Sequence, residues 1–319
     1  MLPLLCLLPV TVFANYSERE DVRQFIAEMA EKYGFDREQL LDTFSQVEKQ
    51  DWVLEAIARP AEKTKTWAEY RSIFITSARI EQGVDFLRRH RDTLARAEQT
   101  YGVPAEIITA IIGVETFYGT RSGSTRVLDS LATLGFDYPP RRSFFLQELE
   151  QFLLLAREEN LDSTEILGSY AGAMGMPQFI SSSYRHYAVD FDGDGKRDLW
   201  NNPVDVIGSV ANYFQRHGWN KGKPIVSRAS VAAPDRIDNI NELKPNTSIG
   251  LLRQRGVTPE QSLGDDEMAS LFRFDGNDGD EYWLGLNNFY VITRYNHSAL
   301  YAMAVYQLSR EIWVRRDDT

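Results

Sequence analysis

One glutamate, Glu115, stands where a long apolar run meets a pair of aromatic residues. Isoleucines and a valine precede it at helical spacing, and Thr116, Phe117, Tyr118 and Gly119 follow it. Burial disfavours the charged form of a carboxyl group and raises its pKa toward neutrality. Such a group can protonate a glycosidic oxygen as a general acid. The alternative is a glutamate that only caps a helix end or forms an ion pair there.

A second cluster, residues 168–180, is rich in small residues. Its sequence is Gly-Ser-Tyr-Ala-Gly-Ala-Met-Gly-Met-Pro-Gln-Phe-Ile. Small residues allow close backbone approach, and Gln178 offers both amide donors and an acceptor. The cluster could therefore shape a narrow groove for a sugar. The alternative is a tightly packed loop whose small residues serve packing alone.

A third motif places acidic residues at alternate positions of a short loop. Asp190, Asp192, Asp194 and Asp198 occupy positions one, three, five and nine of a calcium-binding loop, and the backbone carbonyl of Lys196 falls at position seven. The twelfth position holds an asparagine where the usual loop has a bidentate glutamate. We expect a structural metal ion here, calcium or else sodium. The alternative is an acidic loop that binds nothing.

Helical patterns predict the elements that carry these residues. Apolar residues recur at turn spacing from 18 to 101, which predicts three to five helices with breaks at Gly34, Pro60 and Gly83. Further helices are expected over 103–115, 145–157, 204–217 and 298–314. Between 221 and 282, short apolar runs alternate with Gly, Pro, Asn and Asp, which predicts a small strand-rich insertion.

Taken together, the motifs resemble those of the lytic murein transglycosylase B family. The resemblance rests on Ile112 to Gly119, on the glycine-rich cluster that ends in Gln178 and Phe179, and on Tyr290 to Asn296. Shorter agreeing stretches lie at 59–62, 67–71, 205–214 and 295–298. The match spans nearly everything after the first 14 residues, and so many motifs in order are more specific than any one of them.

The resemblance implies a mainly α fold with a small β subdomain, in the α+β class. It implies an N-terminal helical layer over 15–100 and a small antiparallel sheet over 221–282. Between and after them, 101–220 and 283–319 would form a lysozyme-like catalytic core that contains the loop 190–205.

The resemblance also implies a reaction. The family cleaves the β-1,4 bond between N-acetylmuramic acid and N-acetylglucosamine in peptidoglycan with a single glutamate, which matches Glu115. That residue first acts as an acid toward the leaving oxygen and then as a base toward the C6 hydroxyl of the muramic acid, which closes a 1,6-anhydro ring. An intramolecular hydroxyl takes the place of the second carboxylate that a retaining glycosidase needs.

Several residues match substrate-binding positions of the family. Ser169 and Gln178 match positions that contact the sugars. The remaining matches to the cleft are Tyr70, Phe179, Tyr213, Tyr290, Tyr295 and Asn296. Aromatic rings suit the faces of pyranose rings because both surfaces are largely apolar. For each tyrosine taken alone, a core or surface role is the alternative.

Two further assignments depart from the family pattern. Arg141 and Arg142 match an arginine pair that can meet anionic groups of the substrate, but Pro140 displaces the pair by one position. A solvated charge pair at a helix start is the alternative. The family closes its metal loop with an acid that matches Asp205, and this chain has one residue more before that position.

Composition limits the compartment and the partners. The chain has 319 residues and a formal charge of -11, with 35 basic and 46 acidic residues, which excludes ordinary nucleic-acid binding. Residues 1–14 are uncharged and nearly all apolar, as in a secretory signal peptide. We expect a periplasmic monomer that acts on peptidoglycan glycan strands, with wall-synthesis proteins as further candidate partners. Lipid attachment at Cys6 is less favoured because leucines precede it.

Two other functions stay open from the sequence. A lysozyme-type hydrolase would cut the same bond with water and leave a reducing muramic end. A glycan-binding scaffold would keep the fold without catalysis, although it would have no need for a carboxylate in an apolar pocket. No cofactor is expected for the catalytic step.

Overall fold

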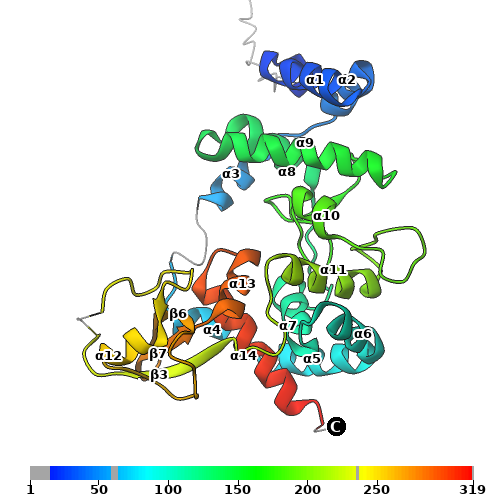
Figure 1. The fold of residues 1–319 in the computed structure, drawn as a ribbon. Helices are drawn as coiled ribbons and strands as arrows, with labels where there is room; N and C mark the ends of the chain where they lie inside the picture. Colours follow the sequence, from blue (N-terminus) through cyan, green and yellow to red (C-terminus); the bar gives the residue numbers. More distant parts are fainter. Residues whose placement is uncertain (1–14, 59–63, 235–236, 318–319) are drawn as a thin grey trace, which may run out of the picture.

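The structure is a computed structural model that describes residues 15–58, 64–234 and 237–317. Within these residues helices predominate, and a small antiparallel sheet lies at one side (Figure 1). The predicted α+β fold class is therefore confirmed. The apolar segment 1–14 and the expected break at Pro60 lie outside the described residues. No helix in the described ranges is both long and apolar enough to cross a membrane.

Within the described residues up to 101, six α-helices and one short 3-10 helix form. Their bounds are η1 (Tyr16–Glu18), α1 (Glu20–Tyr33), α2 (Arg37–Ser45), α3 (Asp51–Ile57), α4 (Trp67–Phe74), α5 (Ser77–Arg89) and α6 (Arg91–Tyr101). Gly34 ends α1 in the left-handed conformation, as its place in the sequence predicts.

The break expected at Gly83 is wrong, because this glycine lies inside α5. A Cβ atom at this position would collide with the hydroxyl of Tyr118 and with the side chain of Ile312. The glycine therefore serves close packing of α5 against the catalytic region, and this need outweighs its weak helix propensity.

These helices contribute to two parts of the molecule. Helices α1 and α2 pack beside α8 (Val127–Asp137), where the rings of Phe25 and Phe44 lie 5.9 and 6.3 Å from that of Phe136. Helices α4 to α6 lie in the other part, at the lower half of Figure 1. The 15–100 segment, expected as one layer, is thus divided, with α3 beside α8 in the upper part.

Helix α7 (Ala105–Thr116) is the centre of the lower part. Its residues from Ile107 to Val114 are all buried, as expected for a helix that neighbours cover on every side. The elements packed against it are α5, α6, α11 (Pro203–Arg216) and α14 (Ala299–Arg315). The predicted helices at 103–115, 204–217 and 298–314 are confirmed within one or two residues at each end.

The upper part contains η3 (Pro139–Arg141), α9 (Arg142–Glu158) and α10 (Ser181–Tyr187). Helix α9 confirms the helix predicted at 145–157. A short antiparallel pair, β1 (Thr125–Arg126) and β2 (Leu167–Gly168), leads directly into the glycine-rich cluster.

The larger sheet has five antiparallel strands in the order β4-β6-β7-β3-β5. The strands are β3 (Val226–Val231), β4 (Thr247–Ser248), β5 (Val257–Pro259), β6 (Met268–Gly276) and β7 (Gly279–Gly285), with α12 (Ile249–Gln254) between β4 and β5. The rings of Trp67 and Phe274, 5.4 Å apart, join α4 to β6. Helix α13 (Asn287–Tyr295) then returns the chain to α14 and the core.

Candidate active site

Glu115 is the second-last residue of α7 and is half-buried. The chain turns sharply after it, because Phe117 and Tyr118 have φ angles of 52° and 58° in the left-handed region. The hydroxyl of Thr116 donates a hydrogen bond of 2.8 Å to the carbonyl oxygen of Met176. The end of α7 is therefore fixed to the glycine-rich cluster that the sequence singled out.

Tyr301, in the first turn of α14, contacts the carboxylate directly. Its hydroxyl donates a hydrogen bond of 2.5 Å to Oε1 of Glu115. Burial raises the pKa of Tyr301 well above its usual range, and the negative charge of Glu115 raises it further. The tyrosine therefore stays protonated and remains a donor at any physiological pH. Sequence reasoning missed this residue, because its spacing indicates only one more buried position of a helix.

Behind this pair lies a cluster of aromatic side chains. The ring of Tyr295 stacks on that of Tyr301 at 6.4 Å and lies 5.8 Å from Phe179 and 4.8 Å from Tyr213. Tyr295 donates to the carbonyl oxygen of Pro177 at 2.5 Å. Burial, followed by the charge of Glu115, raises the pKa of Tyr295 well above its usual range.

Three of the four other aromatic residues predicted for this region are buried. Phe179 is 2% exposed, Tyr213 is 6% exposed, and Tyr70 is 2% exposed. The hydroxyl of Tyr213 donates to the carbonyl oxygen of Arg294 at 2.5 Å, and the ring of Tyr70 lies 5.1 Å from Phe74. These positions suit residues that support the site from behind more than residues that touch a sugar.

The glycine-rich cluster is held by its own side chains. Ser169 Oγ accepts hydrogen bonds from the backbone N–H groups of Ala171 and Ala173. Gln178 adopts a φ angle of 52°, and its Nε2 donates to the carbonyl oxygens of Ser122 and Gly175 at 3.1 and 2.9 Å. The cluster is thus a rigid loop that joins the two parts of the molecule next to Glu115.

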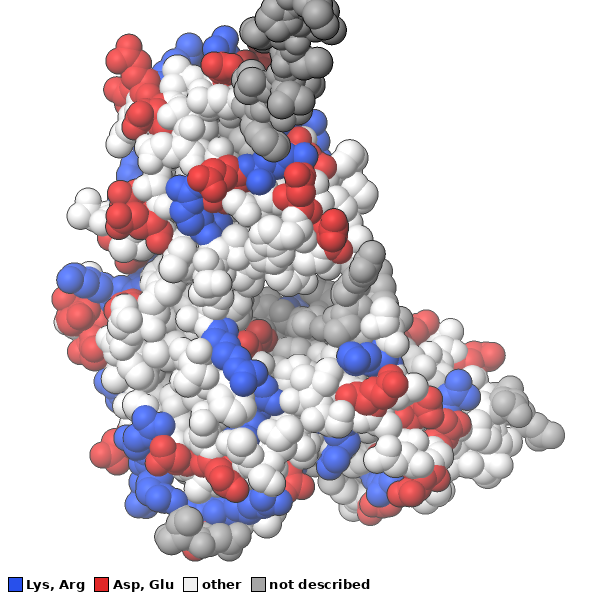
Figure 2. All heavy atoms as spheres, turned by 180° about the vertical axis from the view of Figure 1, so that it is seen from behind, with Lys and Arg blue, Asp and Glu red and all other residues white. Residues whose placement is uncertain are grey.

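A groove of about 740 Å³ begins beside this site. The residues that line it are Ile57, Ala58, Tyr138, Arg141, Tyr170, Asn241, Arg273, Phe274, Asn296, His297, Ser298, Ala299 and Leu300. Ser298 to Leu300 immediately precede Tyr301, so the start of α14 connects the groove with Glu115. Figure 2 shows that the face opposite to the view of Figure 1 is hollowed between the upper and lower parts.

The two arginines of the predicted pair have different surroundings. Arg141 lines this groove, and its guanidinium lies 4.1 Å from the ring centre of Phe144. Arg142 instead forms an ion pair of 3.2 Å with Asp21 on α1. Asn296 lines the groove as well. Contact of these residues with substrate stays a prediction, and the placement favours Arg141 and Asn296 over Arg142.

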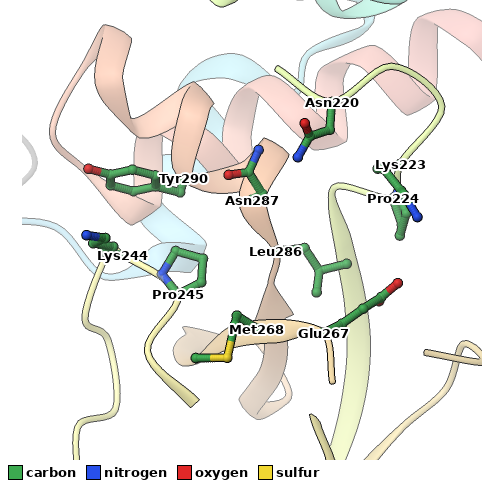
Figure 3. Close-up of a pocket in the computed structure, with 10 residues that line it drawn as sticks. All are labelled: Asn220, Lys223, Pro224, Lys244, Pro245, Glu267, Met268, Leu286, Asn287 and Tyr290. Atoms are coloured by element: carbon green, nitrogen blue, oxygen red, sulfur yellow. The ribbon is translucent and has the colours of Figure 1, made fainter. Parts of the chain in front are cut away.

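Tyr290 lies in a different pocket, of about 360 Å³, between the sheet and the core. Figure 3 shows its ring beside Lys244 and Pro245, with Asn287 next to it and Met268 on the opposite side. Tyr290 therefore lines a pocket other than the groove beside Glu115, although both residues lie in motifs of the resemblance.

The acidic loop has two sets of carboxylates. Oxygens of Asp190, Asp192 and Asp194 lie within 4.8 Å of one another and are exposed. Backbone N–H donors hold Asp190, first among them Gly195, and these bonds lower the pKa of Asp190 below its usual value. The three exposed carboxylates offer the hard oxygen ligands that calcium prefers.

The second set, Asp198 and Asp205, accepts hydrogen bonds from backbone N–H groups. Asp205 is buried and accepts hydrogen bonds from the N–H groups of Phe191 and Asp198 at 2.7 and 2.9 Å. It thereby ties the two ends of the loop to the start of α11. Asp198 accepts from the N–H groups of Trp200 and Asn201. Lys196 donates its own N–H to Asp194 at 2.8 Å. Metal ligation by Lys196, Asp198 and Asp205 stays a prediction.

The Transglycosylase SLT domain family matches residues 17–310 of the chain. The chain belongs to this family. A curated relative, membrane-bound lytic murein transglycosylase B of Escherichia coli (strain K12), is 48% identical over 311 residues, which are 95% of this chain and 85% of that protein. By family and by this relative the enzyme is a lytic murein transglycosylase, as the sequence motifs predict.

Solved structures agree with this assignment. The E. coli lytic transglycosylase Slt35 in complex with calcium has a TM-score of 0.86 and 50% identity, and covers 92% of this chain and 93% of its own. SltB3 from Pseudomonas aeruginosa, in complex with NAG-anhNAM-pentapeptide, has a TM-score of 0.79 and 32% identity, and covers 92% of this chain and 79% of its own. The helical fold with its small sheet is therefore the fold of this family.

Proposed function

We propose that Glu115 cleaves the β-1,4 bond between N-acetylmuramic acid and N-acetylglucosamine in peptidoglycan without using water. The observation that carries this proposal is the half-buried carboxylate of Glu115, which receives a hydrogen bond from Tyr301 beside a groove. The complex of the relative SltB3 with an anhydro-muramic peptide supports the same product class.

The reaction has two steps. In the first, protonated Glu115 gives its proton to the glycosidic oxygen, the bond between that oxygen and C1 breaks, and N-acetylglucosamine leaves with a free hydroxyl. In the second, the Glu115 carboxylate takes the proton of the muramic C6 hydroxyl, and the C6 oxygen bonds to C1. The carboxyl group is thereby protonated again, so acid and base are one residue.

The remaining residues position the substrate and the acid. Tyr301 orients the Glu115 carboxyl group through its hydrogen bond to Oε1. Asn296 and Arg141 contact the strand along the groove, with Arg141 meeting anionic groups. Ser169 and Gln178 contact the sugars from the glycine-rich cluster. Phe179, Tyr213 and Tyr70 keep the cluster around Tyr295 in place and exclude water from it, which strengthens electrostatic interactions at the carboxylate.

The products test the proposal. Purified sacculi treated with the enzyme should release muropeptides that end in 1,6-anhydro-muramic acid, each lighter by one water than the corresponding hydrolytic product. Mass spectrometry of the released fragments measures this difference directly. Reducing muramic ends would instead establish the lysozyme-type hydrolase, and release of nothing would favour the glycan-binding scaffold.

The same proposal assigns a structural calcium ion to the acidic loop. Asp190, Asp192 and Asp194 would hold the ion, and Asp205 would fix the loop to α11. The loop directly follows α10 and leads into α11, which carries Tyr213, so the ion would stabilise one wall of the site. The calcium complex of the relative Slt35 supports this assignment.

Removal of calcium should lower the melting temperature of the enzyme by roughly 4 °C, because a ligand at a hundredfold excess over its Kd stabilises by about 3 kcal/mol. Calorimetry with and without a chelator measures the change. The Asp192→Asn variant should lose this dependence, whereas Asp266→Asn, at an exposed position outside the loop, should keep it. An unchanged melting temperature in protein that contained calcium beforehand would refute a structural role.

The enzyme works in the periplasm in this proposal, because its substrate lies there. The curated relative is described as membrane-bound. Glycan strands are the partner that the groove accommodates, and a monomer suffices because the carboxylate, the tyrosine and the groove belong to one chain.

A further inference from the structure

An exposed tryptophan lies next to the groove. Trp52 on α3 is 49% exposed, and its ring lies 6.4 Å from that of Tyr170 at an angle of 60°. Tyr170 lines the groove and follows Ser169 in the glycine-rich cluster. Ile57 and Ala58, at the end of α3, line the groove as well. Trp52 does not line the groove itself, but its exposed ring lies directly beside Tyr170, which does.

Hydrogen bonds connect the Trp52 ring and the segment before it to the rest of the upper part. Its indole N–H donates a hydrogen bond of 3.0 Å to the amide oxygen of Gln50. The backbone N–H of Gln50 in turn donates to Thr133 at 3.0 Å, and that of Glu48 donates to Asp129 at 3.1 Å. Both acceptors lie on α8, so α8 fixes the segment that precedes α3.

The chemistry of this pair suits a sugar. A single exposed apolar side chain is ordinary on a protein surface, but two adjacent aromatic rings, one of which lines a groove, form a recognition surface. Their faces can stack on the C–H face of a pyranose ring, and the angle between them leaves an edge for hydroxyl groups. A fixed ring also loses little conformational entropy when a ligand binds.

We propose that Trp52 and Tyr170 form an aromatic subsite that binds a sugar of the glycan strand remote from the bond that is cut. The proposal rests on the proposed function, because it takes the substrate to be a long glycan strand. The subsite would favour strands long enough to extend from Glu115 along the groove to α3.

A series of peptidoglycan glycan strands of defined length tests the subsite. The Trp52→Ala variant should lose about 3- to 10-fold in kcat/KM on long strands, the range that one aromatic contact accounts for. The loss should be absent for the shortest strands that the enzyme cleaves. Trp52→Phe should recover most of the activity on long strands, because it keeps a ring. Val314→Ala, which truncates another exposed apolar residue on α14, should show no loss at any length.

Binding provides a second measurement. Calorimetric titration of long strands into a Glu115→Gln protein should show weaker binding when Trp52 is also replaced by Ala. An equal loss at every strand length, or no loss at any length, would overturn the subsite. Failure of the proposed function is distinguishable, because the unaltered enzyme would then release no anhydro products from any strand.

Discussion

The Glu115→Gln variant is expected to release anhydro-muropeptides from sacculi about 10² to 10⁴ times more slowly than the unaltered enzyme, the range that general acid–base catalysis contributes. Glutamine keeps the size of the side chain but cannot deliver a proton to the leaving oxygen. It also cannot accept the proton of the C6 hydroxyl, so both steps of the reaction become slower. Quantitative mass spectrometry of the released fragments measures the rate.

Two controls make this result specific to the site. The variant should retain the melting temperature and the glycan affinity of the unaltered enzyme, because the amide can still accept the hydrogen bond from Tyr301. Glu106→Gln is the matched replacement, since Glu106 also lies on α7 and burial raises the pKa of its carboxyl group. That variant should cleave normally. Retained cleavage in Glu115→Gln would assign the acid to another residue.

The elements that position Glu115 could be predicted because their signals are local. A long apolar run that opens with a proline favours a helix that is covered on all sides, and α7 is such a helix. In α9, α11 and α14 the apolar residues recur with the period of a helix, which predicts a helix with one buried face. This pattern can be recognised within each segment alone. The acidic loop follows from a spacing rule, and three of its carboxylates do lie close together.

The details that sequence could not provide depend on residues far apart in the chain. Tyr301 and Glu115 are 186 positions apart, and no local pattern distinguishes a tyrosine that faces a carboxylate from one that fills a core. Gly83 was expected to break a helix, but its role depends on Tyr118 and Ile312, which approach it from other helices. The ion pair of Arg142 with Asp21 likewise joins residues that are far apart in the chain, so the sequence gives no sign of it.

Tyr301→Phe is expected to slow cleavage by roughly 10- to 100-fold, because a hydrogen bond to a charged group is worth about 1.5–3 kcal/mol. The variant loses the hydrogen bond that orients Oε1 of Glu115, so kcat should fall more than KM rises. The alkaline limb of the pH–rate profile should also move to higher pH, because a hydrogen bond to the ionised form of an acid favours that form. Initial rates on glycan strands from about pH 4 to about pH 9 measure both effects.

The matched control lies on the same helix. Tyr306→Phe removes the hydroxyl of a tyrosine on α14 whose pKa burial also raises and whose ring lies 6.3 Å from Trp283, near the sheet. This variant should keep the rate and the pH profile of the unaltered enzyme. If Tyr301→Phe lowered the melting temperature but left the pH profile in place, Tyr301 would serve only packing. A shifted profile with an intact fold would instead establish that its hydroxyl orients the carboxylate for both proton transfers.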